Sequence, residues 1–436
     1  MAFALVLLAV CAVPFARRGD LLEPVKVFAL LFAMSMGVRG IINLYQESIW
    51  ISSYGLGSAE YKHKMSLVFI YSIIAMLALY LGYYSKLGGA IAARLPNFSF
   101  LSKKRGKMAV AAVFAVIISG LSTYIFFKKV GGLETLGDPH AVITSGIEEG
   151  GRLFYSLFMD FSAVGFVLLY AYTAGRRRIL IEKTLLLALL LLIFAQFLIV
   201  GMKGYLVGFS VMMVVSYHYL KERLSAKKAL LALLLVLLLL PLFDNYKRFG
   251  LSAGMMFGEY APLDVGHTAS LTLTRSAGAD MFFQGIDKTP SLYPFQYGRT
   301  LLRVFTSFVP RPFWPEKPWS FGIDFNRDYL ELPEFMAAVS PSTIGELYIN
   351  FHVMGIVAGF FLIGCFLRCL YGYCINGATS REKVVLYAIV MERMIVLVDG
   401  PIGDFTTFVL IKLFPFAALG GILKLMDGKR SVGHGG

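Results

Sequence analysis

Long apolar runs joined by short polar connections make up most of the chain, and one long polar stretch interrupts this pattern. The apolar runs extend to about residue 243 and resume at about residue 343. A helix needs about 20 apolar residues to cross a bilayer, so the pattern predicts an all-α polytopic membrane protein with about 11 (10–12) transmembrane helices. The predicted spans are, approximately, 3–16, 27–45, 65–85, 108–127, 153–174, 183–200, 204–220, 228–243, 343–367, 384–398 and 402–424.

The polar stretch divides the chain into three predicted parts. Residues 1–243 hold the N-terminal transmembrane helices, 244–342 form one large external loop, and 343–436 hold the C-terminal transmembrane helices and a tail. Such a loop is where a polytopic protein of this kind is expected to carry its chemistry.

Two short amphipathic helices are expected inside the loop, at about 265–285 and about 296–309. The Pro-rich segment 310–319 cannot form a helix or a central strand. Its Trp and Phe residues favour an extended strip at the membrane interface.

Composition supports the membrane assignment, and the distribution of Lys and Arg predicts the orientation of the chain in the membrane. The chain is 57% hydrophobic and 16% charged, whereas a soluble protein is about 25% charged. The net charge of +14 suggests nucleic-acid binding at first, but 23 of the 41 Lys and Arg residues lie in five connections and the tail. Short cytoplasmic connections carry such an excess. The N-terminus is therefore predicted outside, the C-terminus inside and, by counting spans, the large loop outside.

Several kinds of chemistry have no support in the sequence. The four cysteines lie in or beside apolar runs, none is in the loop, and they are expected to be small buried side chains. No Cys/His spacing is typical of a metal site. No Ser-His-Asp order, phosphate-binding glycine loop or dinucleotide-binding glycine motif is present. This argues against ATP or nucleotide-sugar chemistry, and no cofactor or metal is expected.

Cations on the outer side are the first candidates for a binding site. Arg binds phosphate groups bidentately and does not lose its charge, so a pyrophosphate near the membrane is a natural ligand. The alternative is a solvated loop with salt bridges or lipid-headgroup contacts, and for the cations in outer turns simple anchoring at the interface. The candidates are Arg152, Lys203, Arg248, Arg275, Arg299, Arg303, Arg311 and Lys317.

Acidic and neighbouring polar residues are the second set. Glu346 lies at the start of an apolar run, where a charge is expensive and often functional. It is the preferred candidate for a catalytic base, with His267 as the second, and Tyr348 keeps this end polar. The alternatives are a helix-capping role for Glu346 and no role for His267. Asp160, inside an apolar run, needs a partner, and Glu392, Arg393, Asp399 and Asp404 are expected to form a structural polar cluster.

Five short motifs are spread along most of the chain. They are GDLLEP at 19–24, GMKG at 201–204, Arg248, PRPFWPEKP at 310–318 and IGELYINF at 344–351. Together they resemble the motifs of the Wzy-type polymerases of oligosaccharide repeat units, including the O-antigen polymerases of bacterial inner membranes. Two positions depart from the family pattern: Lys203 stands where Arg is common, and His352 stands where Gly is frequent.

The resemblance implies a GT-C-like glycosyltransferase in the bacterial inner membrane with a periplasmic loop. It implies transfer of a glycan from undecaprenyl pyrophosphate to the non-reducing end of a new lipid-linked repeat unit. The partners would be the lipid-linked oligosaccharide, membrane lipid, a flippase and a chain-length regulator. Because pyrophosphate is a good leaving group, cations can stabilise the developing charge without a metal.

Three other functions fit the same pattern. A ligase would transfer the finished glycan to lipid A core, and a flippase or other transporter would move the lipid-linked oligosaccharide. A non-catalytic partner of a polysaccharide assembly complex is the third. Polar residues spread through the membrane helices would favour a transporter, whereas polar residues concentrated outside favour surface chemistry.

Overall fold

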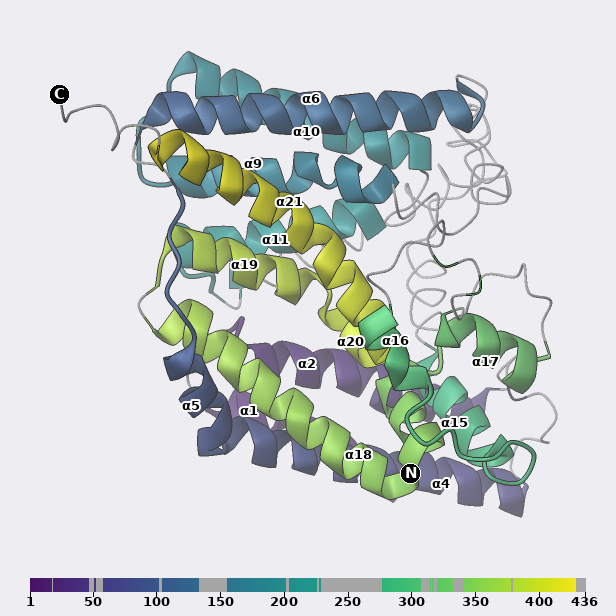
Figure 1. Cartoon of the computed structure of the whole chain (residues 1–436). Coiled ribbons are helices and arrows are strands. Elements are labelled where there is room, and N and C mark those ends of the chain that lie inside the picture. The colour runs from purple at the N-terminus through teal and green to yellow at the C-terminus, as the bar shows by residue number, and fades with distance from the viewer. Residues whose placement is uncertain are drawn as a thin grey trace. The chain divides into compact units, whose positions relative to one another are not determined.

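Figure 1 shows the structure, a computed structural model of the whole chain. Every regular element in the part of the chain that it describes is a helix, which confirms the predicted all-α class. The described residues are 1–17, 19–46, 51, 58–101, 104–132, 155–200, 204–225, 227–228, 277–306, 314, 316, 320–331, 340–377 and 379–428.

The chain forms two compact units, here called unit 1 and unit 2. Unit 1 combines parts of all three predicted sequence segments. It comprises Met1–Leu95, Ser270–Gly377 and Arg393–Phe408, and unit 2 comprises Pro96–Ala269, Ala378–Glu392 and Val409–Gly436.

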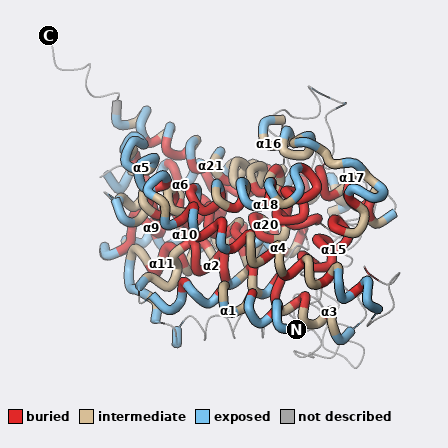
Figure 2. The backbone as a smooth tube through the Cα atoms, turned by 90° about the horizontal axis from the view of Figure 1, so that it is seen from below, coloured by how far each residue is buried: buried red, intermediate tan, exposed pale blue. Residues whose placement is uncertain are grey.

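Unit 1 contains the helices on both sides of the large loop and the described helices of the loop itself. Its buried side chains follow α2, α4, α15 and α18 (Figure 2). Its elements are α1 (Ala2–Ala16), α2 (Pro24–Phe32), η1 (Ala33–Val38), α3 (Arg39–Tyr45), α4 (Ala59–Tyr84), α5 (Lys86–Arg94), α15 (Gly278–Lys288), η3 (Thr300–Leu302), α16 (Arg303–Thr306), α17 (Phe321–Tyr329), α18 (Ser342–Tyr371), η5 (Gly372–Asn376), α20 (Met394–Asp399) and the first turns of α21 (Ile402–Gly428).

The described part of unit 2 includes the remainder of α21 and the helices α6 (Arg105–Lys129), α9 (Phe161–Thr173), α10 (Leu180–Val200), α11 (Gly204–Leu220) and α19 (Arg381–Glu392). Its apolar core includes Phe126, Met159, Ile199 and Val200.

Seven helical segments among the described residues are long and apolar enough to cross a membrane, so the protein is membrane-embedded. Each corresponds to a predicted span. The predicted spans 3–16 and 204–220 form the shorter helices α1 and α11, and 384–398 is divided between α19 and α20. The predicted span 228–243 lies outside the described residues. The seven segments are Pro24–Tyr45, Ala59–Tyr84, Arg105–Lys129, Tyr155–Thr173, Leu180–Val200, Ser342–Asn376 and Ile402–Asp427.

Helices α4 and α18 pack against each other through glycines. A Cβ atom added at Gly82 would lie 2.0 Å from the carbonyl oxygen of Phe361, and one at Gly364 would lie 2.1 Å from that of Leu79. Small residues let membrane helices approach this closely. The two backbones are therefore in direct contact, which fixes the position of α18.

Helix α18 is interrupted at Phe351 and His352, where the backbone leaves the helical region (φ −140° and +56°). The stretch Ser342–Asn376 has 35 residues, which at 1.5 Å per residue would span about 52 Å, more than the bilayer core of about 30 Å. Before the break, every residue from Ser342 to Asn350 is buried in protein. After it, side chains such as Met354 are exposed (74%). Because its exposed side chains include such large apolar ones, the half of α18 after the break is the one expected to face the bilayer.

Candidate functional site

The large loop is attached to the end of the first half of α18 by backbone hydrogen bonds. The N–H of Gln296 donates to the carbonyl of Ile349 (3.0 Å), and the N–H of Tyr297 donates to that of Asn350 (3.2 Å). The interruption of α18 leaves these two carbonyls without helical partners. A turn with left-handed backbone at Tyr297 and Gly298 then leads into η3. The helix predicted at 296–309 therefore begins later than expected, with helical turns from 300 to 306 among the described residues.

Glu346, the preferred sequence candidate, is fully buried in the first half of α18. Its Oε1 accepts a hydrogen bond from the hydroxyl of Thr300 (2.8 Å), and its Oε2 accepts one from the backbone N–H of Ile402 (2.7 Å). Ile402 is the first residue of α21, where a carboxylate is stabilised by the unpaired N–H groups of the helix. Glu346 therefore caps α21. The capping alternative had predicted that it caps its own helix, α18.

Asn350 completes this arrangement one turn further along α18. Its Nδ2 donates to Thr300 Oγ1 (2.7 Å) and to the carbonyl of Glu346 (2.8 Å), and its Oδ1 accepts from the N–H of Gly298 (2.7 Å). Every polar atom of the Asn350 side chain is thus used to hold 298–300 in place. The cluster of Thr300, Glu346 and Asn350 joins the loop, α18 and α21.

Two of the predicted arginines lie on this held segment, four residues apart. Arg303 is mostly buried, and its Nε lies 3.5 Å from Oδ1 of Asp404 on α21. Arg299 is exposed. Among the described residues its guanidinium forms no hydrogen bond or ion pair within contact distance. The backbone of Arg299 is therefore held in place, while the N–H donors of its guanidinium point to the surroundings of the protein.

The charges near these arginines influence one another. Burial raises the pKa of the Asp324 carboxyl on α17 above its ordinary value, although the positive charges of Arg327, Arg299 and Arg303 oppose this shift. Both arginines of the 299–303 pair are thus within electrostatic range of the same carboxyl. Arg327 itself is paired with Asp328 (2.7 Å) and Asp324 (3.2 Å), so its positive charge is locally neutralised.

Tyr348 lies in an aromatic cluster and has 4% of its surface exposed. Its ring stacks on Tyr71 of α4, with ring centroids 5.8 Å apart, and lies 5.0 Å from the ring of His352. Phe295 of the loop packs against the same two residues of α18. The cluster fills the space beneath the loop, and substrate binding by Tyr348 stays a prediction.

The structure therefore brings together three of the predicted site residues, Glu346, Arg299 and Arg303, and places Tyr348 nearby. The remaining predicted site residues lie outside the described part of the chain: Arg152, Lys203, Arg248, His267, Arg275, Arg311 and Lys317.

Among the described contacts, three of the four residues that were expected to form one polar cluster have different partners. Asp404 pairs with Arg303, and Asp399 accepts a hydrogen bond from Ser35 of η1. Glu392 belongs to unit 2, where it pairs with Lys412. A bidentate pair that the sequence did not indicate, Arg39 with Asp280, ties α3 to α15 inside unit 1.

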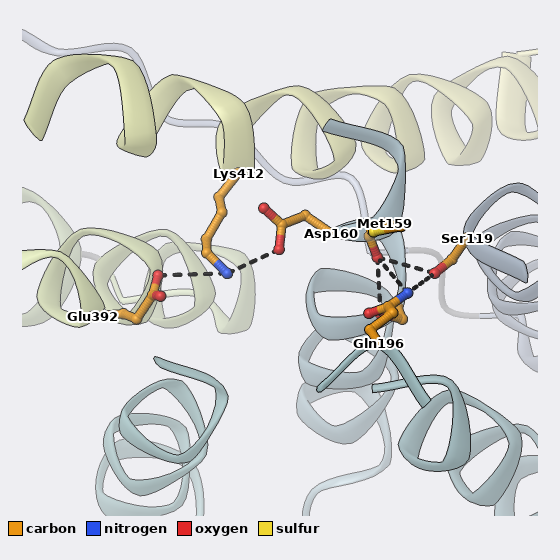
Figure 3. A network of polar contacts seen from close by, with 7 residues as sticks. Ser119, Met159, Asp160, Gln196, Glu392 and Lys412 are labelled. Atoms are coloured by element: carbon orange, nitrogen blue, oxygen red, sulfur yellow. Dashed lines mark hydrogen bonds and ion pairs between the residues drawn. The ribbon is translucent and has the colours of Figure 1, made fainter. Parts of the chain in front are cut away.

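A second polar group lies within the apolar helices of unit 2 (Figure 3). Gln196 of α10 donates through Nε2 to Ser119 (2.8 Å) and Thr123 (3.0 Å) of α6 and to the carbonyl of Met159 (3.3 Å). Ser162 donates to Oε1 of Gln196 (2.9 Å). This buried amide is fully satisfied and holds α6, α9 and α10 together.

Asp160, next to Met159, was expected to need a partner inside its apolar run, and that partner is Lys412. Lys412 of α21 lies 3.1 Å from Oδ1 of Asp160 and 3.6 Å from Oε2 of Glu392 on α19 (Figure 3). Glu392 is also packed tightly against α11, because a Cβ added at Gly208 would lie 2.1 Å from its Oε1. All three charged side chains have 6% or less of their surface exposed. Lys412 thus links three helices of unit 2.

One family model matches part of the chain. Residues 264–373 match a domain of unknown function, DUF8712. The match extends over α15, α16, α17 and all of α18, and so includes Arg299, Arg303 and Glu346. No curated protein and no solved structure matches the chain.

Proposed function

We propose that the chain is a membrane glycosyltransferase that polymerises oligosaccharide repeat units carried on undecaprenyl pyrophosphate. The observation that carries this proposal is Arg299. Its exposed guanidinium projects from a backbone that the cluster of Thr300, Glu346 and Asn350 holds against α18 and the first residue of α21. A lipid-linked pyrophosphate lies at that depth, and guanidinium groups bind it bidentately.

The rest of the proposal follows from the resemblance to the Wzy-type polymerases and from the placement of the charges along the chain. The enzyme would have a GT-C-like arrangement in the bacterial inner membrane, with a periplasmic loop and a cytoplasmic C-terminus. A flippase would supply its substrate, and a chain-length regulator would act with it. The other predicted cations, among them Arg248, Arg275 and Arg311, would complete the pyrophosphate site.

In the proposed reaction, a hydroxyl at the non-reducing end of a new repeat unit attacks C1 of the sugar attached to the pyrophosphate. The new C1–O bond forms as the bond from C1 to the pyrophosphate oxygen breaks, and the pyrophosphate leaves with the electron pair. Arg299 neutralises the negative charge that develops there. The hydroxyl proton passes to a base, for which Glu346 and His267 are the sequence candidates.

The surroundings of Glu346 favour a positioning role in the described conformation. It is fully buried, and each carboxylate oxygen already accepts a hydrogen bond. It would act by holding Thr300, and hence Arg299, at a fixed place against α21. Proton transfer to Glu346 would require at least one of these bonds to open.

Thr300→Val distinguishes these two roles, because valine keeps the shape of the side chain and loses the hydroxyl. If Glu346 positions the arginine, we expect the rate of polymerisation to fall by about tenfold or more, as for a lost hydrogen bond to a buried charge. The measurement is polymer formed per minute by purified enzyme at saturating lipid-linked repeat unit. If Glu346 is the base, Thr300→Val keeps nearly the wild-type rate while Glu346→Gln is inactive.

Deletion of the gene tests the function itself. The proposal expects surface glycan to be reduced to a single repeat unit, with the ladder of longer chains lost on a gel and restored by the wild-type gene. Ladders that persist after deletion would contradict it. Polymer that accumulates on the lipid carrier would indicate the ligase instead.

A transporter of lipid-linked oligosaccharide is the second candidate. The buried polar groups of unit 2, centred on Gln196 and Lys412, support it, because transporters carry such groups within their membrane helices. The same deletion separates the two functions. Loss of a transporter removes all repeat units from the cell surface, whereas loss of a polymerase leaves single units.

A further inference from the structure

The turn and short helices at 297–306 expose three large apolar side chains. Tyr297 is 77% exposed, Leu302 is 58% exposed and Phe305 is 74% exposed. Apolar side chains grouped in this way on a surface mark contact with another apolar phase. The nearby helix α17 differs, since its exposed residues include Arg327 and Asp328, which pair with each other.

Two contacts fix the depth of this segment relative to the membrane helices. Tyr297 is bonded through its backbone to Asn350, immediately before the bilayer-facing half of α18 begins. Side-chain carbons of Arg303 lie 3.1–3.4 Å from the position of a Cβ at Gly403, in the first turn of α21. Gly403 lies in the first turn of an apolar span, and Asn350 immediately precedes the half of α18 whose side chains are exposed, so the segment is expected at the level of the bilayer surface.

The residue types of the segment 297–306 are those expected at the surface of a bilayer. Tyrosine is enriched at the interface between headgroups and acyl chains. Leu302 and Phe305 are three residues apart, which places them on one side of a short helix. Arg299 adds an exposed guanidinium, which matches the phosphate groups of lipid headgroups.

We propose that residues 297–306 form an interfacial anchor that inserts into the leaflet on the loop side of the membrane. Leu302 and Phe305 reach the upper acyl region, and Arg299 lies at the level of the lipid phosphates. The occupant of this surface is the bilayer itself and not a protein partner. The inference concerns membrane contact alone and does not depend on the reaction that the protein catalyses.

Spin labels report the depth directly. The full-length protein, with its four cysteines replaced by serine, is labelled singly at position 302 or 305 and placed in nanodiscs of phosphatidylethanolamine and phosphatidylglycerol. Leu81, a 69% exposed residue of the membrane helix α4, is the bilayer control. Glu331, with 75% of its side chain exposed just after α17, is the water control. Collision rates with oxygen and with a neutral nickel chelate are measured at each site.

We expect labels at 302 and 305 to have a several-fold higher ratio of oxygen to nickel collisions than the label at 331, approaching that at 81. Equal ratios at 302, 305 and 331 would place the segment in water and overturn the proposal. Low collision rates with both reagents would show that protein covers the surface, which overturns it as well. Because all four positions are exposed, labelling leaves the core intact, and each sample is checked by its elution as a single species.

Discussion

Arg299→Ala is expected to reduce polymerisation by about 10²–10³-fold, the usual effect of removing one donor that stabilises a developing charge. The guanidinium is exposed and is held at its backbone by the cluster of Thr300, Glu346 and Asn350. Its loss removes a phosphate ligand and leaves the fold unchanged. The measurement is kcat/KM of purified protein with lipid-linked repeat unit, together with the chain-length profile in cells.

Arg327→Ala is the matched control, since it removes an arginine from the same loop whose charge is already paired with Asp328 and Asp324. We expect its activity to stay within about threefold of the wild type, as for an exposed ion pair. Arg299→Lys should also be impaired, because lysine cannot bind phosphate bidentately. A wild-type profile for Arg299→Ala, with normal protein level, would exclude the arginine from the reaction.

Lys412→Met is expected to destabilise the protein by about 3–5 kcal/mol, the typical cost of leaving buried charges without their partner. Asp160 and Glu392 would then both be buried near each other without the cation between them. The measurement is the midpoint of thermal unfolding in detergent, compared with the wild type. This effect requires no knowledge of the function.

The compensating triple variant, Lys412→Met with Asp160→Asn and Glu392→Gln, serves as the control. Because it removes both carboxylate charges as well, it should recover a large part of the lost stability. If the single variant unfolds at the wild-type temperature, the three side chains do not depend on one another. If the triple variant is stable but inactive, the charges themselves serve the function.

The membrane helices could be predicted from the sequence because the length of an apolar run is a local property. Each of the seven membrane-spanning segments in the described ranges coincides with a predicted span. The break in α18 could not be predicted in this way. No proline lies at Phe351 and His352, and apolar residues continue on both sides of them. It is stabilised by the loop, whose N–H groups bind the two freed carbonyls.

The candidate site was predicted in part, for a similar reason. Glu346 could be identified because an acid in an apolar run is costly and needs a partner. The partners of Glu346 could not be identified from the sequence. One is the hydroxyl of an ordinary threonine, Thr300, and the other is the backbone N–H of Ile402, 56 residues away. Lys412 was not singled out, although a cation in an apolar run is as costly as an acid and also needs a partner. Its partner Asp160 lies 252 residues away in the sequence, and only the folded chain brings them together.

The attachment of the loop to α18 has a consequence for how the sequence can change over evolution. Two of its bonds join the main chains of Gln296 and Tyr297 to those of Ile349 and Asn350. Main-chain bonds of this kind form with almost any side chain, so Gln296 can vary freely without moving the loop. Tyr297 and Gly298, with their left-handed backbones, and Asn350 should resist substitution more strongly. Distant relatives could therefore share this anchoring geometry while retaining little recognisable similarity in the loop.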